Sequence, residues 1–71
     1  MPAMPAGVVK SWHTGWGIIT PTDGGEEVFV HRTEIRSPVG RHRLAPLERV
    51  SYHVVQTERG PAARCVRVWE G

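Results

Sequence analysis

Residues 16–31 decide the fold, and they read WGIITPTDGGEEVFVH. Near the end of this stretch, Val28 and Val30 alternate with Phe29 and His31. A period of two is typical of a strand, whose successive side chains point to opposite faces. The alternation therefore predicts a strand with one aliphatic face and one aromatic and polar face.

Two further strands are predicted before this one. Residues 7–13 and 16–20 are β-branched or aromatic runs with no helical period. Residues 13–15 leave room only for a tight turn between these runs. Residues 21–25, Pro-Thr-Asp-Gly-Gly, form the densest turn cluster in the sequence and connect to the strand at 26–31. We expect three antiparallel strands in succession.

The second half of the chain predicts one helical turn, a long loop and two more strands. These segments are residues 32–35, 37–45, 49–56 and 62–69. Leu44 and Leu47 flank Pro46, and we expect both leucines to plug one end of a barrel. Five short strands separated by Gly and Pro turns predict an all-β fold, a small five-stranded antiparallel barrel of the OB type.

Length and composition limit the class of protein. A chain of 71 residues forms one domain, which we place at residues 7–70 after a short disordered tail at residues 1–6. No run reaches the roughly 18 apolar residues that would cross a bilayer, so we expect a cytoplasmic protein with no membrane partner. Cys65 is the single cysteine, which excludes an intrachain disulfide.

The charge pattern gives a weak indication of a polyanionic partner. The chain carries 9 Lys+Arg against 7 Asp+Glu, a net charge of +2. Residues 31–43 hold four arginines and two histidines, and Glu34 is their only acid. This stretch is either a solvated loop or a phosphate-binding loop. Arginine favours the second reading slightly, because guanidinium binds phosphate through two hydrogen bonds.

No constellation for catalysis or metal binding is found. The four histidines show no close pairing such as H-x3-H, and Cys65 lies late in a strand, where cysteine is usually packed. We predict no catalytic residue, no metal, no cofactor and no small-molecule substrate. The histidines are His13, His31, His42 and His53.

Trp16 and Phe29 are candidates for an exposed aromatic surface. If both point outward on adjacent strands, they form a platform on which unpaired bases stack, each base contributing about 1–3 kcal/mol. Gly15 and Gly17 would leave the space around Trp16 uncrowded. The alternative arrangement buries the two rings and exposes the valines of the strand at 26–31.

Several motifs resemble the cold-shock domain family. Residues 15–19, Gly-Trp-Gly-Ile-Ile, look like its Gly-aromatic-Gly-aromatic-Ile motif, and residues 28–31, Val-Phe-Val-His, match its second ribonucleoprotein motif. Residues 7–10, 50–52 and 59–63 resemble its first, fourth and closing segments. The resemblance implies a five-stranded OB-fold barrel that binds single-stranded RNA or DNA with little sequence selectivity, as an RNA chaperone or a regulator of transcription or translation.

The first turn departs from the family pattern. Lys10-Ser11-Trp12 is followed only by His13 and Thr14 before the glycine motif, about two residues fewer than usual. Alignment from Lys10 puts Ser11 at the usual tryptophan position. A one-residue bulge would return Trp12 to the binding face, and we expect Trp12 to be at least partly exposed there.

Two other departures replace rings. Ile18 stands at the second aromatic of the glycine motif, and Arg32 stands at the aromatic that commonly follows the histidine. The basic loop at residues 41–43 also lies where the family often has a ring. We expect phosphate contacts to replace part of the lost stacking, which makes binding salt-dependent.

The resemblance and the residue pattern together give one predicted interface for single-stranded RNA or DNA. Its residues are Lys10, Trp12, Trp16, Ile18, Phe29, His31, Arg32, Arg41, His42 and Arg59. We expect a monomer or a weak, strand-exchanged dimer. The alternative function is a protein-interaction barrel with weak nucleic-acid affinity, which the missing rings and the modest net charge favour.

Overall fold

A computed structural model describes residues 5–37 and 39–69, which form five strands and one 3-10 turn. The elements are β1 (Ala6–His13), β2 (Trp16–Pro21), β3 (Val28–His31), η1 (Arg32–Glu34), β4 (Arg49–Thr57) and β5 (Gly60–Val68). The predicted all-β class and the short turn after the third strand are confirmed. No helix among the described residues is long and apolar enough to cross a membrane.

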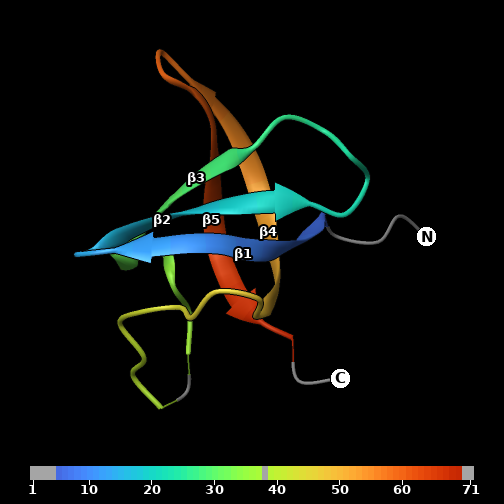
Figure 1. The fold of residues 1–71 in the computed structure, drawn as a ribbon. Coiled ribbons are helices and arrows are strands. Elements are labelled where there is room, and N and C mark those ends of the chain that lie inside the picture. The colour runs from blue at the N-terminus through green and yellow to red at the C-terminus, as the bar shows by residue number, and fades with distance from the viewer. Residues whose placement is uncertain (1–4, 38, 70–71) are drawn as a thin grey trace.

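The strands close into a barrel in the order β1-β2-β3-β5-β4. The sheet is antiparallel at every junction except one, where β3 meets β5 in parallel through Phe29 and Ala62. β4 and β5 run behind β1 and β2 and cross them steeply (Figure 1). Closure reduces the sheet edge that is open to pairing with another chain. The predicted barrel is therefore confirmed, with a parallel seam as its closing contact.

The ends of the domain differ slightly from the predicted boundaries. β1 begins at Ala6, and the carbonyl of Pro5 accepts a hydrogen bond from the Tyr52 N–H at 3.0 Å. Ordered pairing therefore starts inside the segment predicted as a tail. Residues 1–4 of that tail and residue 70 lie outside the described residues.

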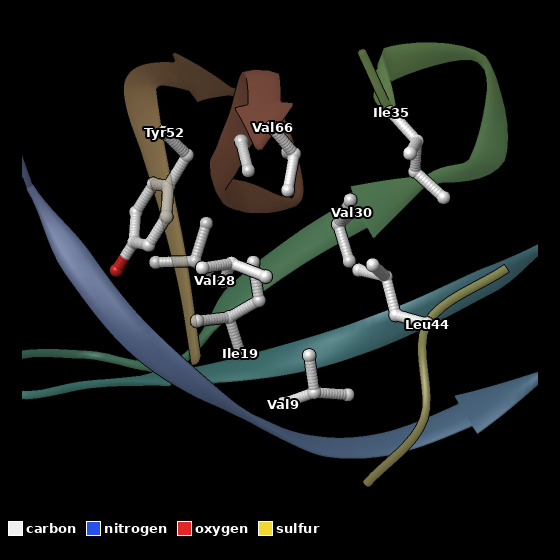
Figure 2. Close-up of a cluster of buried hydrophobic side chains, with 10 residues drawn as sticks. Val9, Ile19, Val28, Val30, Ile35, Leu44, Tyr52 and Val66 are labelled. Carbon is white, nitrogen blue, oxygen red and sulfur yellow. The ribbon is translucent and has the colours of Figure 1, made fainter. Parts of the chain in front are cut away.

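The barrel is filled by ten buried side chains, eight of which Figure 2 labels. They are Val9, Ile19, Val28, Val30, Ile35, Leu44, Val50, Tyr52, Ala63 and Val66. Val28 and Val30 are 2% and 0% exposed, whereas Phe29 between them is 39% exposed. The predicted alternation is confirmed, and the arrangement with outward valines is excluded.

Tyr52 is the largest of the fully buried side chains. Its hydroxyl donates to the carbonyl of Ala6 at 3.5 Å, at the start of β1. Burial, and then the negative charge of Asp23, raise the pKa of this hydroxyl above its ordinary value. The tyrosine therefore stays neutral at physiological pH and ties β4 to β1.

Of the two leucines expected to plug the barrel, only Leu44 enters the core. Leu44 is buried as predicted, but Leu47 is 82% exposed, so its predicted burial is wrong. The physical reason is backbone pairing: Leu47 N–H donates to the Val9 carbonyl at 2.8 Å, and Val9 N–H donates to the Glu48 carbonyl at 2.8 Å. Leu47 adopts φ +75° to make this contact, which turns its side chain to solvent.

The positive φ of Leu47 gives a stability prediction. A left-handed residue with a Cβ costs roughly 1–2 kcal/mol, and asparagine tolerates this region better than most residues. We expect Leu47→Asn to raise the free energy of unfolding by about 0.5–1 kcal/mol. Leu47→Ala removes the same exposed apolar side chain and keeps the strain, so urea denaturation should show no such gain for it. Equal gains for both variants would contradict the strain argument.

Candidate nucleic-acid interface

An exposed aromatic row crosses the outer face of β1, β2 and β3. Trp16 pairs with His31 and Ile18 pairs with Phe29 across β2 and β3, which places all four side chains on one face. Trp16 and Phe29 are 38% and 39% exposed, and their rings stack with centroids 5.7 Å apart and planes 23° apart. The two predicted rings thus lie together as a platform.

His13 adds a third ring to this row. Its imidazole stacks on Trp16, with centroids 4.3 Å apart and an interplanar angle of 26°. The turn of Thr14 and Gly15, with φ +82° at the glycine, sets His13 directly opposite Trp16. From the sequence, His13 is a candidate only for metal binding. The shortened first turn was the signal that could have identified its place in the row.

Trp12 is partly exposed, as expected, and lines the groove beside Trp16, but its ring lies on the inner side of the sheet and not on the outer one. The bulge is present between Val9 and Ser11, but its effect is opposite to the one predicted. Counting from the buried Val9, the extra residue puts Ser11 outward and Trp12 inward, where Trp12 pairs with Gly17. The ring is half-buried against the core at the rim of the barrel.

Gly17 serves Trp12 rather than Trp16. A Cβ on Gly17 would lie 2.5 Å from the Ser11 carbonyl oxygen and 2.5 Å from Cε3 of Trp12. The glycine therefore makes room for the inner tryptophan, and the predicted role of clearing the outer ring is wrong. Gly15 instead lies beneath Arg32, whose Cδ would be 3.5 Å from a Cβ there.

A groove of about 730 Å³ runs along the end of the aromatic row. Its walls include Trp12, His13, Trp16, His31, Arg32, His42 and Arg43. The groove thus brings together five of the predicted interface residues and Arg43 of the predicted basic loop, and it adds His13. A smaller groove of about 380 Å³ joins Ile18, Phe29 and Arg59 at the other end of the row.

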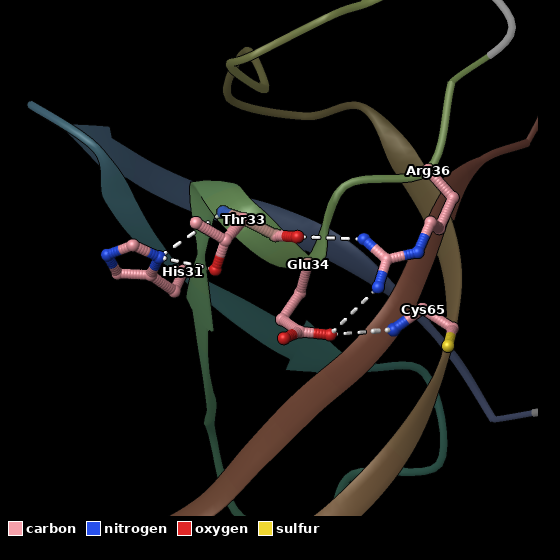
Figure 3. A network of polar contacts seen from close by, with 5 residues as sticks. All are labelled: His31, Thr33, Glu34, Arg36 and Cys65. Carbon is pink, nitrogen blue, oxygen red and sulfur yellow. Dashed lines mark hydrogen bonds and ion pairs between the residues drawn. The ribbon is translucent and has the colours of Figure 1, made fainter.

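The ring of His31 is held in one orientation by Thr33. Thr33 N–H donates to Nδ1 of His31 at 3.2 Å, and the Thr33 hydroxyl lies 2.8 Å from the same nitrogen (Figure 3). Since Nδ1 accepts, the neutral ring carries its proton on Nε2, which points away from Thr33. His31 thus presents a hydrogen-bond donor beside the platform.

Two predicted phosphate-binding cations are held by carboxylates. Lys10 Nζ lies 2.7 Å from Glu27, in an exposed pair. Arg41 donates to both oxygens of Glu48, at 2.9 and 2.7 Å. Arg41 was predicted to bind phosphate. In the structure its guanidinium instead holds the loop before β4 through Glu48.

Glu48 is the centre of that loop. Besides Arg41, it accepts the Ala45 N–H at 2.7 Å. The Arg41 hydrogen bonds hold the pKa of the Glu48 carboxyl below its ordinary value of 4.5. Desolvation opposes this lowering, and the Ala45 N–H adds to it. The carboxylate therefore stabilises the folded chain at neutral pH.

Among residues 5–37 and 39–69, no three His, Cys, Asp or Glu side chains gather closely enough to hold a metal ion. What the outer face offers is stacked rings, a fixed imidazole donor and nearby arginines. These features define a small aromatic-faced barrel suited to unpaired nucleic acid.

Comparison with known proteins identifies the family. Residues 5–69 match the family described as 'Cold-shock' DNA-binding domain, and the chain belongs to this cold-shock domain family. Members of the family bind single-stranded nucleic acid and are not enzymes.

Similar proteins come from bacteria and animals. "Probable cold shock protein A" of Mycolicibacterium smegmatis is 42% identical over 66 residues, covering 90% of this chain and 97% of that protein. "Cold shock-like protein CspG" of Escherichia coli (strain K12) is 44% identical over 59 residues, covering 80% and 83%. The solved structure "drosophila Unr CSD456" has a TM-score of 0.77 at 18% identity, covering 94% of this chain and 27% of that one, which shows a shared fold.

Glu48 predicts a specific loss of stability in acid. A carboxyl with a lowered folded-state pKa stabilises above its unfolded pKa, and this contribution disappears as pH falls through the folded value. We expect Glu48→Gln to lower the free energy of unfolding by about 1–2 kcal/mol at pH 7 and to flatten its decline below pH 4.5. Glu27→Gln, which breaks the exposed pair with Lys10, should cost only about 0–0.5 kcal/mol. Chemical denaturation from pH 7 to pH 3 checks both, and a Glu48→Gln curve parallel to that of the native chain would contradict the assignment.

Gly17 predicts a displacement of the inner tryptophan. Because a methyl group at residue 17 meets the Ser11 backbone as well as Trp12, Gly17→Ala should cost about 1–3 kcal/mol of stability. Trp12 should move outward, which red-shifts the tryptophan emission. Gly25→Ala, whose nearest contact is the side chain of Asp23 at 3.1 Å, serves as the matched control. Unchanged emission and stability in Gly17→Ala would show that the backbone has room.

Proposed function

We propose that this chain binds single-stranded RNA or DNA non-covalently through the row of His13, Trp16 and Phe29. The observation that carries the proposal is the stacked, exposed pair of Trp16 and Phe29 on the outer face of β2 and β3. Both ring faces are apolar and sequence-neutral, so any unpaired base can stack there. The site therefore selects unstacked strands rather than particular sequences.

The polar and cationic groups around the row determine how a nucleic-acid strand would cross it. His31 offers its Nε2–H to a base edge or a phosphate, while Arg32 and Arg43 line the groove at one end and Arg59 lines the groove at the other. A strand that crosses the row would meet cations before and after the stacked bases. This arrangement supports a site of roughly six to eight nucleotides, within the range known for one OB fold.

The consequence for RNA follows from mass action. A protein that binds only the unpaired strand shifts the folding equilibrium of an RNA toward that strand, without any covalent step. We propose an RNA chaperone or a regulator of transcription or translation, acting as a monomer in the cytoplasm. Ile18 and Arg32 stand where rings would be expected. Phosphate contacts therefore contribute a larger share of the binding free energy here than they would on a fully aromatic face.

A second candidate is a protein-interaction barrel with weak nucleic-acid affinity. The ion pairs Lys10–Glu27 and Arg41–Glu48 favour it, because they neutralise two cations that were expected to bind phosphate. The two candidates differ in whether a short oligonucleotide binds at low salt.

Titration with heptathymidine separates the candidates. Stacking on Trp16 should quench the tryptophan fluorescence, and log K should fall with log salt with a slope of about −0.7 for each phosphate contact. Absence of quenching at low salt would favour the interaction barrel. A salt slope near zero would contradict the phosphate contacts.

Substitution of the two rings tests the platform itself. Trp16→Ala and Phe29→Ala should each weaken heptathymidine binding by about 1–3 kcal/mol. The control is Trp69→Phe, because Trp69 is 55% exposed but lines a groove with Pro5 and Val54 away from the row. Anisotropy with labelled heptathymidine measures all three, and native affinity in the double variant Trp16→Ala/Phe29→Ala would rule out the platform.

A further inference from the structure

The outer face of β4 and β5 carries a second group of cations. Arg49 and His53 lie on β4, and Arg64 and Arg67 lie on β5. All four side chains are exposed. His53 pairs with Arg64, and Ser51, between Arg49 and His53, pairs with Arg67. The four side chains therefore form one patch, which we call the β4–β5 arginine face.

This face points away from the aromatic row. In the barrel order, β4 and β5 lie across from β2, and they cross behind β1 and β2 (Figure 1). Outward side chains on opposite walls of a closed barrel point in opposite directions. A ligand on one face therefore leaves the other face free.

A bulge at Cys65 assembles the arginine face. Arg64 and Arg67 are three residues apart, and in a regular strand that spacing puts side chains on opposite faces. The register shifts between Ser51 and His53, so that the β5 segment has one extra residue, and Cys65 adopts φ +53° there. The extra residue brings both arginines outward.

The inner side of β5 shows the same shift. Ala63 and Val66 are also three residues apart, yet both are buried in the core. The bulge is thus compatible with full packing of the barrel. The bulge requires Cys65, which is not a glycine, to adopt a left-handed backbone conformation, and this is unfavourable by roughly 1–2 kcal/mol.

The carboxylate of Glu34 braces the bulge. Its Oε1 accepts the Cys65 N–H at 3.4 Å and lies 3.7 Å from Nη2 of Arg36 (Figure 3). The carboxylate nearest the bulge is therefore engaged by the backbone and by Arg36.

The arginine face carries uncompensated charge. Lys10, Arg36 and Arg41 each lie within ion-pair distance of a carboxylate. In the described part of the chain, no such pair is formed by Arg49, Arg64 or Arg67. The cations of this face are thus available to an external anion.

The same face has no stacked rings. His53 carries the one ring among its four cationic side chains, and no stacking partner is found for it among the described residues. The row from Arg49 to His53 spans roughly 14 Å, at about 3.4 Å for each of four residues. Guanidinium groups contact phosphates whether or not the bases are stacked.

We propose that the β4–β5 arginine face is a second nucleic-acid surface, which binds the phosphate backbone of a duplex while the aromatic row holds an unpaired strand. The inference rests on the proposed function for the class of ligand. Arginine suits this task, because its guanidinium binds phosphate through two hydrogen bonds. One chain would then sit where a duplex meets a single strand and contact both.

The test measures duplex binding while the aromatic row is occupied. Saturating unlabelled heptathymidine fills the row, and the anisotropy of a short, blunt-ended, fluorescein-labelled duplex is followed at several salt concentrations. We expect the native chain to bind the duplex under these conditions. Arg64→Gln/Arg67→Gln should weaken duplex binding about tenfold at low salt and reduce the salt slope by about 1.8, or 0.9 for each lost phosphate contact.

A variant of equal charge controls for the net charge. Arg32→Gln/Arg59→Gln removes two positive charges from the grooves beside the aromatic row and should leave duplex binding within about twofold of native. The variant Arg64→Gln/Arg67→Gln should keep native quenching by heptathymidine and a native melting temperature, since both side chains are exposed.

The outcomes separate the two proposals. Heptathymidine binding without duplex binding would overturn the second surface and leave the proposed function intact. Equal weakening by both double variants would overturn it as well, because the effect would then come from net charge. Competition by polyglutamate as strong as that by unlabelled duplex would reassign the face to acidic proteins. Failure of the native chain to bind heptathymidine would count against the proposed function itself.

Discussion

The antiparallel pairing of β2 with β3 is the constraint on which the rest of the molecule depends. Ile19 lies opposite Val28, and Ile18 lies opposite Phe29. The same register therefore buries the first pair in the core and places the second pair on the outer face. A slip of one residue would exchange the two faces along the whole strand. In a barrel with ten buried side chains, such an exchange would leave almost no core. The burial of the valines therefore enforces the exposure of Phe29. The binding face consists of the side chains that alternate with the buried ones.

Two bulges modify this alternation, and each decides which side chains reach a surface. The first follows Val9 and turns Trp12 inward, where Gly17 gives it room. The second, at Cys65, turns Arg64 and Arg67 to the same side. A bulge thus changes the composition of a face without changing the fold. In this chain, one extra residue in a strand decides which side chains reach a surface.

The sequence predicted the parts of the structure that depend on local patterns. Alternation predicts the strand at Val28 to His31 and places Phe29 on the face opposite the valines, and the burial of the valines then shows which face is outward. Leu47 was misplaced, and Trp12 was expected on the other side of the sheet, since a left-handed leucine and the side to which a bulge turns a residue leave no mark in the hydrophobic pattern. The ion pair of Arg41 with Glu48 is equally absent from that pattern, because it is a contact between two side chains. What the sequence did not predict is thus set by backbone geometry or made between side chains.

The parallel seam has a consequence for how the chain reaches its active form. β3 and β5 meet through one residue pair, Phe29 and Ala62, which come from distant parts of the sequence. Contacts between distant segments carry the loop-closure entropy of the chain between them, and they form late in folding. Phe29 belongs to this seam and also to the aromatic row. A chain whose hairpins have formed but whose seam is open therefore has its β2 and β3 rings in register on a barrel that is not yet closed, and closure then fixes Phe29 from its other side.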